Sequence, residues 1–359
     1  MNKSKLTAFQ FSSMIIFPIL ALFSGVGTHN IIKIAKVDAY ISSFLSFIIG
    51  IFPLLLFLLI FNYKKELSIT EKINYLFGKY LGFLINMLIC ILVLFIGVIL
   101  LYNVTNFAIS QFLSETPLIV FMILIGIIIV YNVSKGIDNI SRVSIIFLIL
   151  ILFLTLISTF GILPNFDVSN LKPFLENGIS LPLKGGISLT LTSVIPIYLL
   201  LIVNKNSISE DKKTNKYILI FYVLSYFLII LASILTIGSL GIYLSEIYQY
   251  PEYTVLKKIS LFNFIDRIEN FIYIKWIFSS VISLSLIVYY IKENIRKKSN
   301  RLVPSVIVIL MIILSLTILK SSTIFYYVSS NIYPYVCLML FMIYIIIGLN
   351  IVIRKLLDG

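Results

Sequence analysis

Charged side chains are scarce in this chain. Lys, Arg, Asp and Glu together make up 12% of its 359 residues, whereas hydrophobic residues make up 60%. A soluble domain cannot hide that much apolar surface, so the composition excludes a soluble globular protein. The mean hydropathy of +1.08 agrees with a protein that lies in a membrane.

Reactive side chains are also few, which excludes several kinds of chemistry. The two cysteines, Cys90 and Cys337, both lie in apolar stretches and predict neither a disulfide framework nor a metal site. The single histidine, His29, cannot form a relay, although pH sensing stays open. The sequence has no HExxH motif, no paired intramembrane carboxylates and no glycine-rich phosphate loop. We expect no catalytic residues, metal or cofactor, and therefore no enzyme.

Acidic residues are outnumbered by basic ones, 15 to 28, and the net charge is +13. Most of the basic excess falls in the polar segments on one side of the apolar stretches, as in the cytoplasmic loops of membrane proteins. The charge therefore indicates topology, with both termini in the cytoplasm, and not a nucleic-acid partner. Lys3 and Lys5 precede an apolar run without a cleavage site, so we expect this run to be the first helix.

Long apolar runs are what the chain has in abundance. A helix needs roughly 20 apolar residues to cross about 30 Å of hydrocarbon. We therefore predict one all-α membrane domain over residues 1–359, with about ten transmembrane helices in the lipid bilayer. The predicted spans are residues 9–32, 39–61, 82–110, 117–132, 143–163, 186–203, 217–243, 270–291, 303–319 and 333–353.

Two of these spans carry helix-breaking residues near their middle. Gly25 and Gly27 interrupt the first span, and Pro196 interrupts the sixth. Paired breaks in two halves are typical of a binding site between inverted repeats. We predict a five-plus-five inverted repeat, about 9–163 and about 186–353, as in the leucine-transporter fold. The alternative is close helix packing, because small residues also let helices approach each other.

Polar clusters in three other places are candidates to line a cavity. Hydroxyls often bond to their own helix, so a structural role is the alternative for each cluster. Lys275 either reaches the outer interface or faces an outer vestibule where a carboxylate enters. The clusters are Tyr102 and Asn106 in span three, Thr190, Thr192 and Ser193 in span six, and Ser279, Ser280 and Ser283, a candidate ion site, in span eight.

Two segments outside the spans have a recognisable pattern. Ser68-Ile-Thr-Glu71 forms a capping box, and the apolar stripe that follows predicts a helix along the inner membrane face. Residues 164–178 are rich in turn formers and predict an ordered outer connection.

Three motifs together resemble the B-type (GerAB-like) subunits of spore germinant receptors. They are Asn170-Leu171-x-Pro173 followed by Gly178, Leu76-Phe-Gly78 followed by Gly82, and Arg267-x-Glu269 followed by Trp276. The resemblance covers essentially the whole chain. It implies membership of the amino acid/polyamine/organocation transporter superfamily and the leucine-transporter fold.

The resemblance implies a sensor of a small nutrient, often an amino acid, in the inner membrane of the endospore. Its partners would be an A-type membrane subunit and a C-type lipoprotein subunit. By position, the ligand would meet Ser24, Gly25, Val26 and Gly27 of the first helix and Thr192, Ser193 and Pro196 of the sixth. An ion-coupled amino acid permease and a water or ion conduit are the alternatives. Span five lacks the lysine that replaces sodium in some relatives, which leaves ion coupling open.

Overall fold

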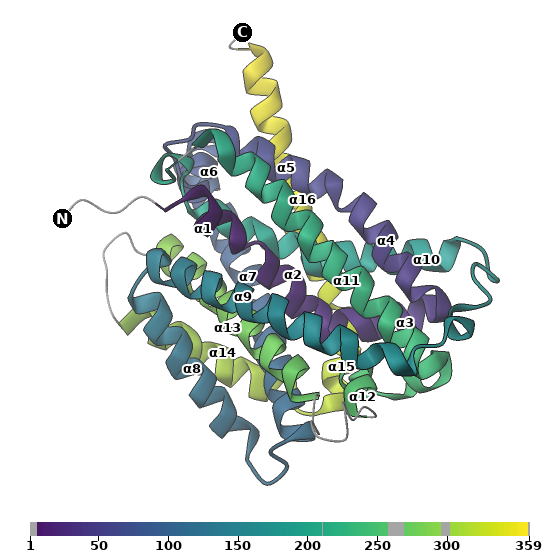
Figure 1. The fold of residues 1–359 in the computed structure, drawn as a ribbon. Helices are drawn as coiled ribbons and strands as arrows, with labels where there is room; N and C mark the ends of the chain where they lie inside the picture. Colours follow the sequence, from purple (N-terminus) through teal and green to yellow (C-terminus); the bar gives the residue numbers. More distant parts are fainter. Residues whose placement is uncertain (1–5, 210, 258–268, 296–301, 358–359) are drawn as a thin grey trace.

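The computed structural model describes residues 6–209, 211–257, 269–295 and 302–357, which form helices and no β-strand (Figure 1). Arg267, part of one motif above, lies outside the described residues. The helices of the first half are α1 (Ala8–Ser13), α2 (Ile16–Leu22), α3 (Thr28–Ala35), α4 (Ala39–Ile49), α5 (Ile51–Asn62), α6 (Ile69–Phe77), α7 (Lys79–Gln111), α8 (Leu118–Ser134) and α9 (Ile137–Ile162).

The second half begins with an irregular span and ends with a long regular one. Its α-helices are α10 (Ser180–Leu189), α11 (Asp211–Ile247), α12 (Pro251–Lys257), α13 (Glu269–Ile295), α14 (Leu302–Ile318), α15 (Ser322–Asn331) and α16 (Tyr333–Leu357). Short 3₁₀ turns occur at Lys36–Asp38, Leu163–Asn165, Val168–Leu171 and Lys205–Ser207.

Seven helical stretches of the described chain are long and apolar enough to cross a membrane. Two shorter apolar helices, Leu118–Ser134 and Leu302–Ile318, accompany them. The longest stretch, Ala8–Asn62, contains two crossings, because the chain reverses its direction between α3 and α4 (Figure 1). Helices therefore lie at each of the ten predicted spans, and the chain is a multi-pass membrane protein.

The first span is broken at its middle, as its glycines predict. Between α2 and α3, Ser24 has an extended ψ of 127° and Gly25 has a φ of 77°. A side chain at Gly25 would be strained at this φ, and its Cβ atom would lie 2.7 Å from Cη2 of Trp276. The hydroxyl oxygen of Thr28 lies in this gap, 3.1 Å from the carbonyl oxygen of Phe23.

The sixth span changes its winding at the predicted place. After α10 comes a widened π turn, Thr190–Val194, and then a 3₁₀ helix, Ile195–Ile202, with Pro196 in its first turn. Proline has no amide proton to give to the carbonyl four residues earlier, which belongs to Thr192. The hydroxyl of Tyr333 donates to that carbonyl instead, at 2.8 Å. Both predicted breaks are thus confirmed, and the two broken segments lie in contact.

The broken spans and α13 occupy the centre of the bundle. Almost every residue of α2, of Ile195–Ile202 and of the middle of α13 is buried, whereas α8 and α14 expose many apolar side chains. A helix that is apolar on all sides lies either inside a protein core or against lipid, so burial by other helices distinguishes the central segments from the peripheral ones. The core therefore lies around the two breaks.

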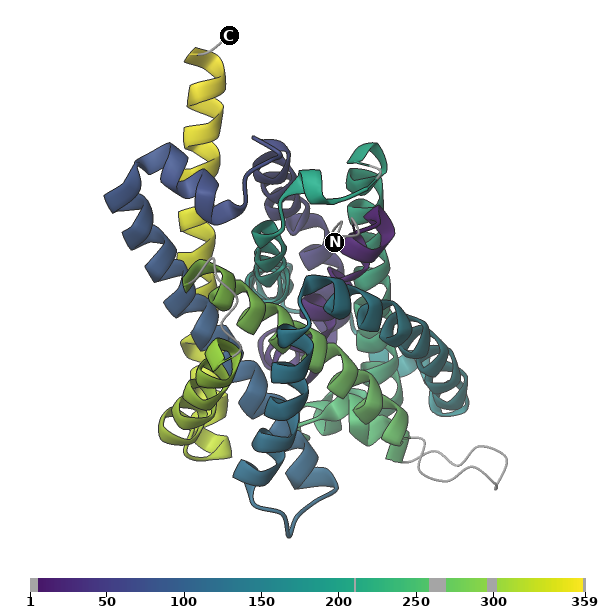
Figure 2. The same ribbon diagram turned by 90° about the vertical axis from the view of Figure 1, so that its left-hand side faces the viewer.

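One end of the bundle is closed by α6, which begins with the predicted capping box. The backbone N–H of Ser68 donates to the Glu71 carboxylate at 3.0 Å. The buried Lys72 donates to the carbonyl of Ile60 at 2.8 Å and also to that of Phe61, in the last turn of α5. Burial lowers the pKa of Lys72 to about 8. At this same end, α16 extends beyond the other helices (Figure 2).

The opposite end carries α12 and α15 (Figure 1). Near this end α11 is kinked at Gly241, which has a φ of 69°. Asn170, from the turn-rich connection, donates its side-chain N–H to the carbonyl of Gly238 at 2.8 Å, and the ring of Phe166 packs directly on Gly238. The connection that carries the Asn170-Leu171-x-Pro173 motif therefore holds the end of α11, from which the chain enters α12.

Candidate functional site

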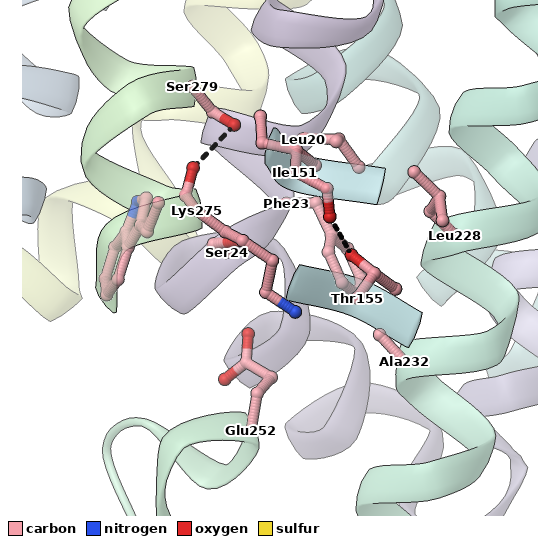
Figure 3. Close-up of a pocket in the computed structure, with 11 residues that line it drawn as sticks. Leu20, Phe23, Ser24, Ile151, Thr155, Leu228, Ala232, Glu252, Lys275 and Ser279 are labelled. Carbon is pink, nitrogen blue, oxygen red and sulfur yellow. Dashed lines mark hydrogen bonds between the residues drawn. The ribbon is translucent and has the colours of Figure 1, made fainter. Parts of the chain in front are cut away.

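A cavity of about 90 Å³ lies beside the break in the first span. Its polar lining residues come from the break in the first span, α9, α12 and α13, and they are Ser24, Thr155, Glu252, Lys275 and Ser279 (Figure 3). A second hollow of about 50 Å³ shares Thr155, Glu252 and Lys275 with the first. This space holds several water molecules or one small solute.

Glu252, on α12, is attached to the opened helix. Its carboxylate accepts the backbone N–H of Gly25 at 3.3 Å and the hydroxyl of Thr28 at 2.6 Å. Thr28 is the first residue of α3 and Gly25 lies in the break just before it, so the carboxylate is near the helix N-terminus, where the helix dipole also favours a negative charge. Burial raises the pKa of Glu252 above its ordinary value, and the hydrogen bonds from Thr28 and Gly25 oppose this rise. The break in the first span thus binds a carboxylate that belongs to the protein itself.

Lys275 approaches the cavity from the other side. It lies near the start of α13, and its ammonium points into the cavity toward Glu252 (Figure 3). Its nearest polar contact is the hydroxyl of Ser158 on α9, at 3.4 Å. Among the described residues, no ion pair joins Lys275 to Glu252. Two opposite charges therefore line one cavity without neutralising each other directly.

An aromatic cluster beside the cavity joins α7, α12 and α13. The ring of Phe107 lies 4.4 Å from that of Trp276, 4.7 Å from Tyr250 and 5.1 Å from Tyr253, between ring centroids. Trp276 also lines the cavity and covers Gly25. Aromatic pairs of this kind contribute about 0.5–1.5 kcal/mol each beyond the area they bury. The cluster packs α12 firmly over the opened helix.

The predicted ligand residues of the first span lie at the break, but only one of them lines the cavity. Ser24 lines it, and Gly25 donates to Glu252. Val26 is buried, and a Cβ atom at Gly27 would lie 3.2 Å from Cδ1 of Leu189 on α10. Gly27 therefore allows the close approach of the two broken spans, which is the packing role considered for these glycines.

The predicted residues of span three lie elsewhere. Tyr102 packs against Phe325, with ring centroids 4.9 Å apart, and the side-chain N–H of Asn106 donates to the hydroxyl of Tyr250 at 2.9 Å. Their neighbour Asn103 reaches the break instead, because its side-chain N–H donates to the carbonyl of Ser24 at 3.1 Å. Asn103 was not predicted, although it is one of two polar residues between those that were, the other being Thr105.

The predicted residues of span six do not line the cavity either. The hydroxyl of Thr192 donates to the carbonyl of Ser188 at 2.9 Å, and Pro196 lies in the 3₁₀ segment. Ser193 is buried, and its hydroxyl has no hydrogen-bond partner among the described residues. These residues shape the sixth span and pack it against the break.

The serines of span eight are only partly brought to the cavity. Ser279 lines it, but its hydroxyl donates to the carbonyl of Lys275 at 2.9 Å. The hydroxyl of Ser283 likewise donates to the backbone carbonyl of Ser279 at 2.7 Å, whereas the Ser280 hydroxyl has no hydrogen-bond partner within the described chain. No group of three or more His, Cys, Asp or Glu side chains within the described ranges is arranged to hold a metal ion. The ion site at Ser279, Ser280 and Ser283 remains a prediction.

The arrangement of broken helices around a polar cavity places the chain in a class of transporter-like membrane proteins. A Na⁺-coupled sialic acid symporter, solved in a substrate-bound outward-open state, superposes on 92% of this chain and 80% of its own length with a TM-score of 0.63. The sequences are 13% identical, so the likeness is one of fold. The chain has the five-plus-five leucine-transporter-like fold with broken first and sixth helices.

The sequence defines the family more closely. The spore germination protein family matches residues 5–323, and the chain belongs to that family. Spore germination protein XB of Bacillus anthracis is 22% identical over 311 residues, which cover 85% of this chain and 86% of the relative. Spore germination protein A2 of Bacillus subtilis (strain 168) is 25% identical over 264 residues, or 72% of this chain and 71% of its own. Spore germination protein KB of the same strain is 24% identical over 257 residues, or 70% and 68%.

Proposed function

We propose that this chain is the B-type subunit of a germinant receptor and binds a small nutrient, an amino acid, beside the opened first span. Binding is passed to an A-type membrane subunit and a C-type lipoprotein subunit, and the chain itself is not an enzyme. Membership of the spore germination family supports this role. The proposed location is the inner membrane of the endospore, with both termini in the cytoplasm, because the basic residues gather on that side.

One observation carries the ligand-binding part of the proposal. The cavity lies where the first span is opened, and it carries both a buried carboxylate and an ammonium group. Ionisable groups inside a membrane protein are energetically unfavourable and usually mark a functional pathway or site. A small zwitterion suits both the size and the charges of this cavity.

An amino acid permease is a second candidate, and the fold of a Na⁺-coupled symporter favours it. The two candidates differ in sustained flux. Proteoliposomes that contain the purified chain accumulate labelled amino acid if it is a permease, and they only bind the amino acid if it is a receptor subunit.

The proposal is tested by a thermal-shift screen of the purified full chain in detergent against amino acids, nucleosides and sugars. A ligand at about 100 times its Kd adds roughly 2.7 kcal/mol of stability if it binds only the folded protein. We expect an amino acid to raise the melting temperature. Ala232, which lines both hollows, allows a direct control of the site.

The variant Ala232→Leu fills the cavity without changing any charge, so we expect it to lose the shift. The matched variant Val223→Leu lies on the exposed side of the same helix and should keep it. If no compound shifts the wild type, or if Ala232→Leu responds as strongly as Val223→Leu, ligand binding in this cavity is wrong.

A further inference from the structure

The opened first span of this protein holds a carboxylate of its own. The N–H of Gly25 and the hydroxyl of Thr28, two donors at the break, both bind Oε1 of Glu252. The side chain is 9% exposed, and α12 is fixed above the break by Tyr250 and Tyr253 of the aromatic cluster. A ligand carboxylate that used the same donors would first have to displace Glu252.

Glu252 nevertheless keeps capacity for another partner. An ionised carboxylate has about four acceptor positions on two oxygens, and the two hydrogen bonds above use only Oε1. The carboxylate also lines both hollows. A donor placed in the cavity can therefore bind Glu252 while Gly25 and Thr28 remain bound to it.

Lys275 supplies the opposite charge across the same space. Its ammonium has three N–H donors, and the one polar contact of that ammonium within the described chain is the long one to Ser158, at 3.4 Å. In Figure 3 the side chains of Lys275 and Glu252 extend toward each other from opposite walls. The remaining walls are mostly apolar or neutral, with Leu20, Phe23, Leu228 and Ala232 among them.

The energetics of buried charge explain why these two groups matter together. An unpaired charge in a low-dielectric region loses far more hydration than a neutral group does, and a partner of opposite sign recovers part of that loss. Glu252 and Lys275 make the cavity neutral as a whole but leave each charge without a directly bonded counter-ion. A molecule with one positive and one negative group would neutralise both.

Resting on the proposed function, we propose that Glu252 and Lys275 are the two poles of the ligand site. Glu252 binds the ammonium group of a small zwitterionic amino acid, and Lys275 binds its carboxylate. The opened first helix positions Glu252 through Gly25 and Thr28 and does not itself bind the ligand carboxylate. The two residues thereby select zwitterions over simple amines and simple acids.

The test compares matched probes on the purified full chain by calorimetric titration. The zwitterions are glycine, L-alanine and L-valine. Their decarboxylated analogues are methylamine, ethylamine and isobutylamine, and their deaminated analogues are acetate, propionate and isovalerate. We expect at least one zwitterion to bind ten-fold or more tightly than both of its analogues.

Two variants then test the contribution of each charged residue to binding. Glu252→Gln keeps an oxygen for Gly25 and Thr28 but loses the charge, so zwitterion affinity should fall at least ten-fold. Lys275→Met should also lose ten-fold for the zwitterion, and it should keep the affinity for the amine analogue. Thr317→Val is the control, because Thr317 lies on α14 outside both hollows and donates its hydroxyl to its own helix at Ile313, and the variant should bind like the wild type.

Two results would overturn this inference alone, and a third would overturn the proposed function as well. If Glu252→Gln binds the zwitterion as tightly as the wild type, Glu252 does not contact the ligand. If the variant binds more tightly, the Glu252 carboxylate competes with the carboxylate of the ligand. If the wild type binds a deaminated analogue with the same affinity as the matching zwitterion, the ammonium group of the ligand has no partner in the site. This measurement uses only the wild type, so it does not depend on the folding of any variant. In each of these cases ligand binding stands while the assignment of poles fails. If the wild type binds none of the nine probes, both proposals fall.

Discussion

Gly25 is the residue on which the opened first span depends. Its φ of 77° lies in the region that favours glycine, and the ring of Trp276 leaves no space for a Cβ atom. We expect Gly25→Ala to lower amino acid affinity at least ten-fold, because strain of about 1–3 kcal/mol and the contact with Trp276 displace the N–H that holds Glu252. Calorimetric titration of the purified variant measures this loss.

Gly78 provides the matched control for Gly25. It has a similar φ of 80°, but nothing lies within 4 Å of a Cβ atom built there. Gly78→Ala should therefore suffer the backbone strain alone and keep its ligand affinity. Equal affinities for Gly25→Ala and Gly78→Ala would show that the break is not part of the site.

Glu252 gives the protein a specific pH dependence. Burial raises the pKa of this carboxyl above 4.5, so between pH 4.5 and the raised value the folded protein binds a proton that the unfolded chain has released. Stability therefore decreases as the pH rises through this window, by about 1.4 kcal/mol for each unit of pKa shift. We expect the melting temperature of the wild type to fall across this window relative to that of Glu252→Gln. Lys275 is the charged group that faces Glu252, and it is present in both proteins. Parallel melting curves would contradict the shift.

The sequence predicts which residue types line a site more readily than it predicts which of them face the cavity. Tyr102 and Asn106 share one face of α7, yet Asn103 reaches Ser24. Adjacent helical residues differ by about 100° in direction, and hydropathy does not fix the rotation of a helix that is buried on most sides. Lys275 was recognised as an intramembrane charge. Glu252 was missed, because it follows span seven in a segment that looks like an ordinary polar loop.

At the scale of elements, α12 is the segment that joins the cavity to the rest of the protein. It follows the kink of α11 at Gly241, and Asn170 holds this kink from the turn-rich connection through Gly238. The Asn170-Leu171-x-Pro173 motif therefore has a structural role. The motif fixes the end of α11 and thereby the position from which α12 presents Glu252.

We expect Asn170→Ala to loosen α12. The variant loses one hydrogen bond, with a net contribution of about 0.5–1.5 kcal/mol, and α12 should exchange its backbone amides faster in hydrogen-exchange mass spectrometry. Asn331→Ala is the control, since the side chain of Asn331 also donates to a carbonyl, that of Tyr327, but at an exposed position at the end of α15. Identical exchange of α12 in the two variants would show that the motif does not position this helix.

Element positions were the most predictable level of the structure. Apolar runs of sufficient length located every span, the glycines and Pro196 located both breaks, and Ser68 with Glu71 located the start of α6. These features depend on local chemistry, namely the length of a run, a missing amide proton or a cap. The position of α12 depends on its contacts with α7, α11 and α13. Contacts between helices so far apart in the sequence cannot be predicted from local chemistry.

At the scale of the whole molecule, the chain shares its fold with a symporter to which it is only 13% identical. The fold requires apolar spans and two breaks, and many sequences satisfy these requirements. It does not decide between sensing and transport. Those functions depend on the groups that face the cavity, which here are Glu252 and Lys275.

A structure of the full chain with a bound amino acid, determined by electron cryo-microscopy, tests the central claim most directly. The account predicts the amino acid in the cavity beside Gly25, with its ammonium group within hydrogen-bond distance of Glu252 and its carboxylate within reach of Lys275. Glu252 should still accept the N–H of Gly25. An amino acid whose carboxylate binds Gly25 after Glu252 has moved away, or one bound outside this cavity, would contradict the account.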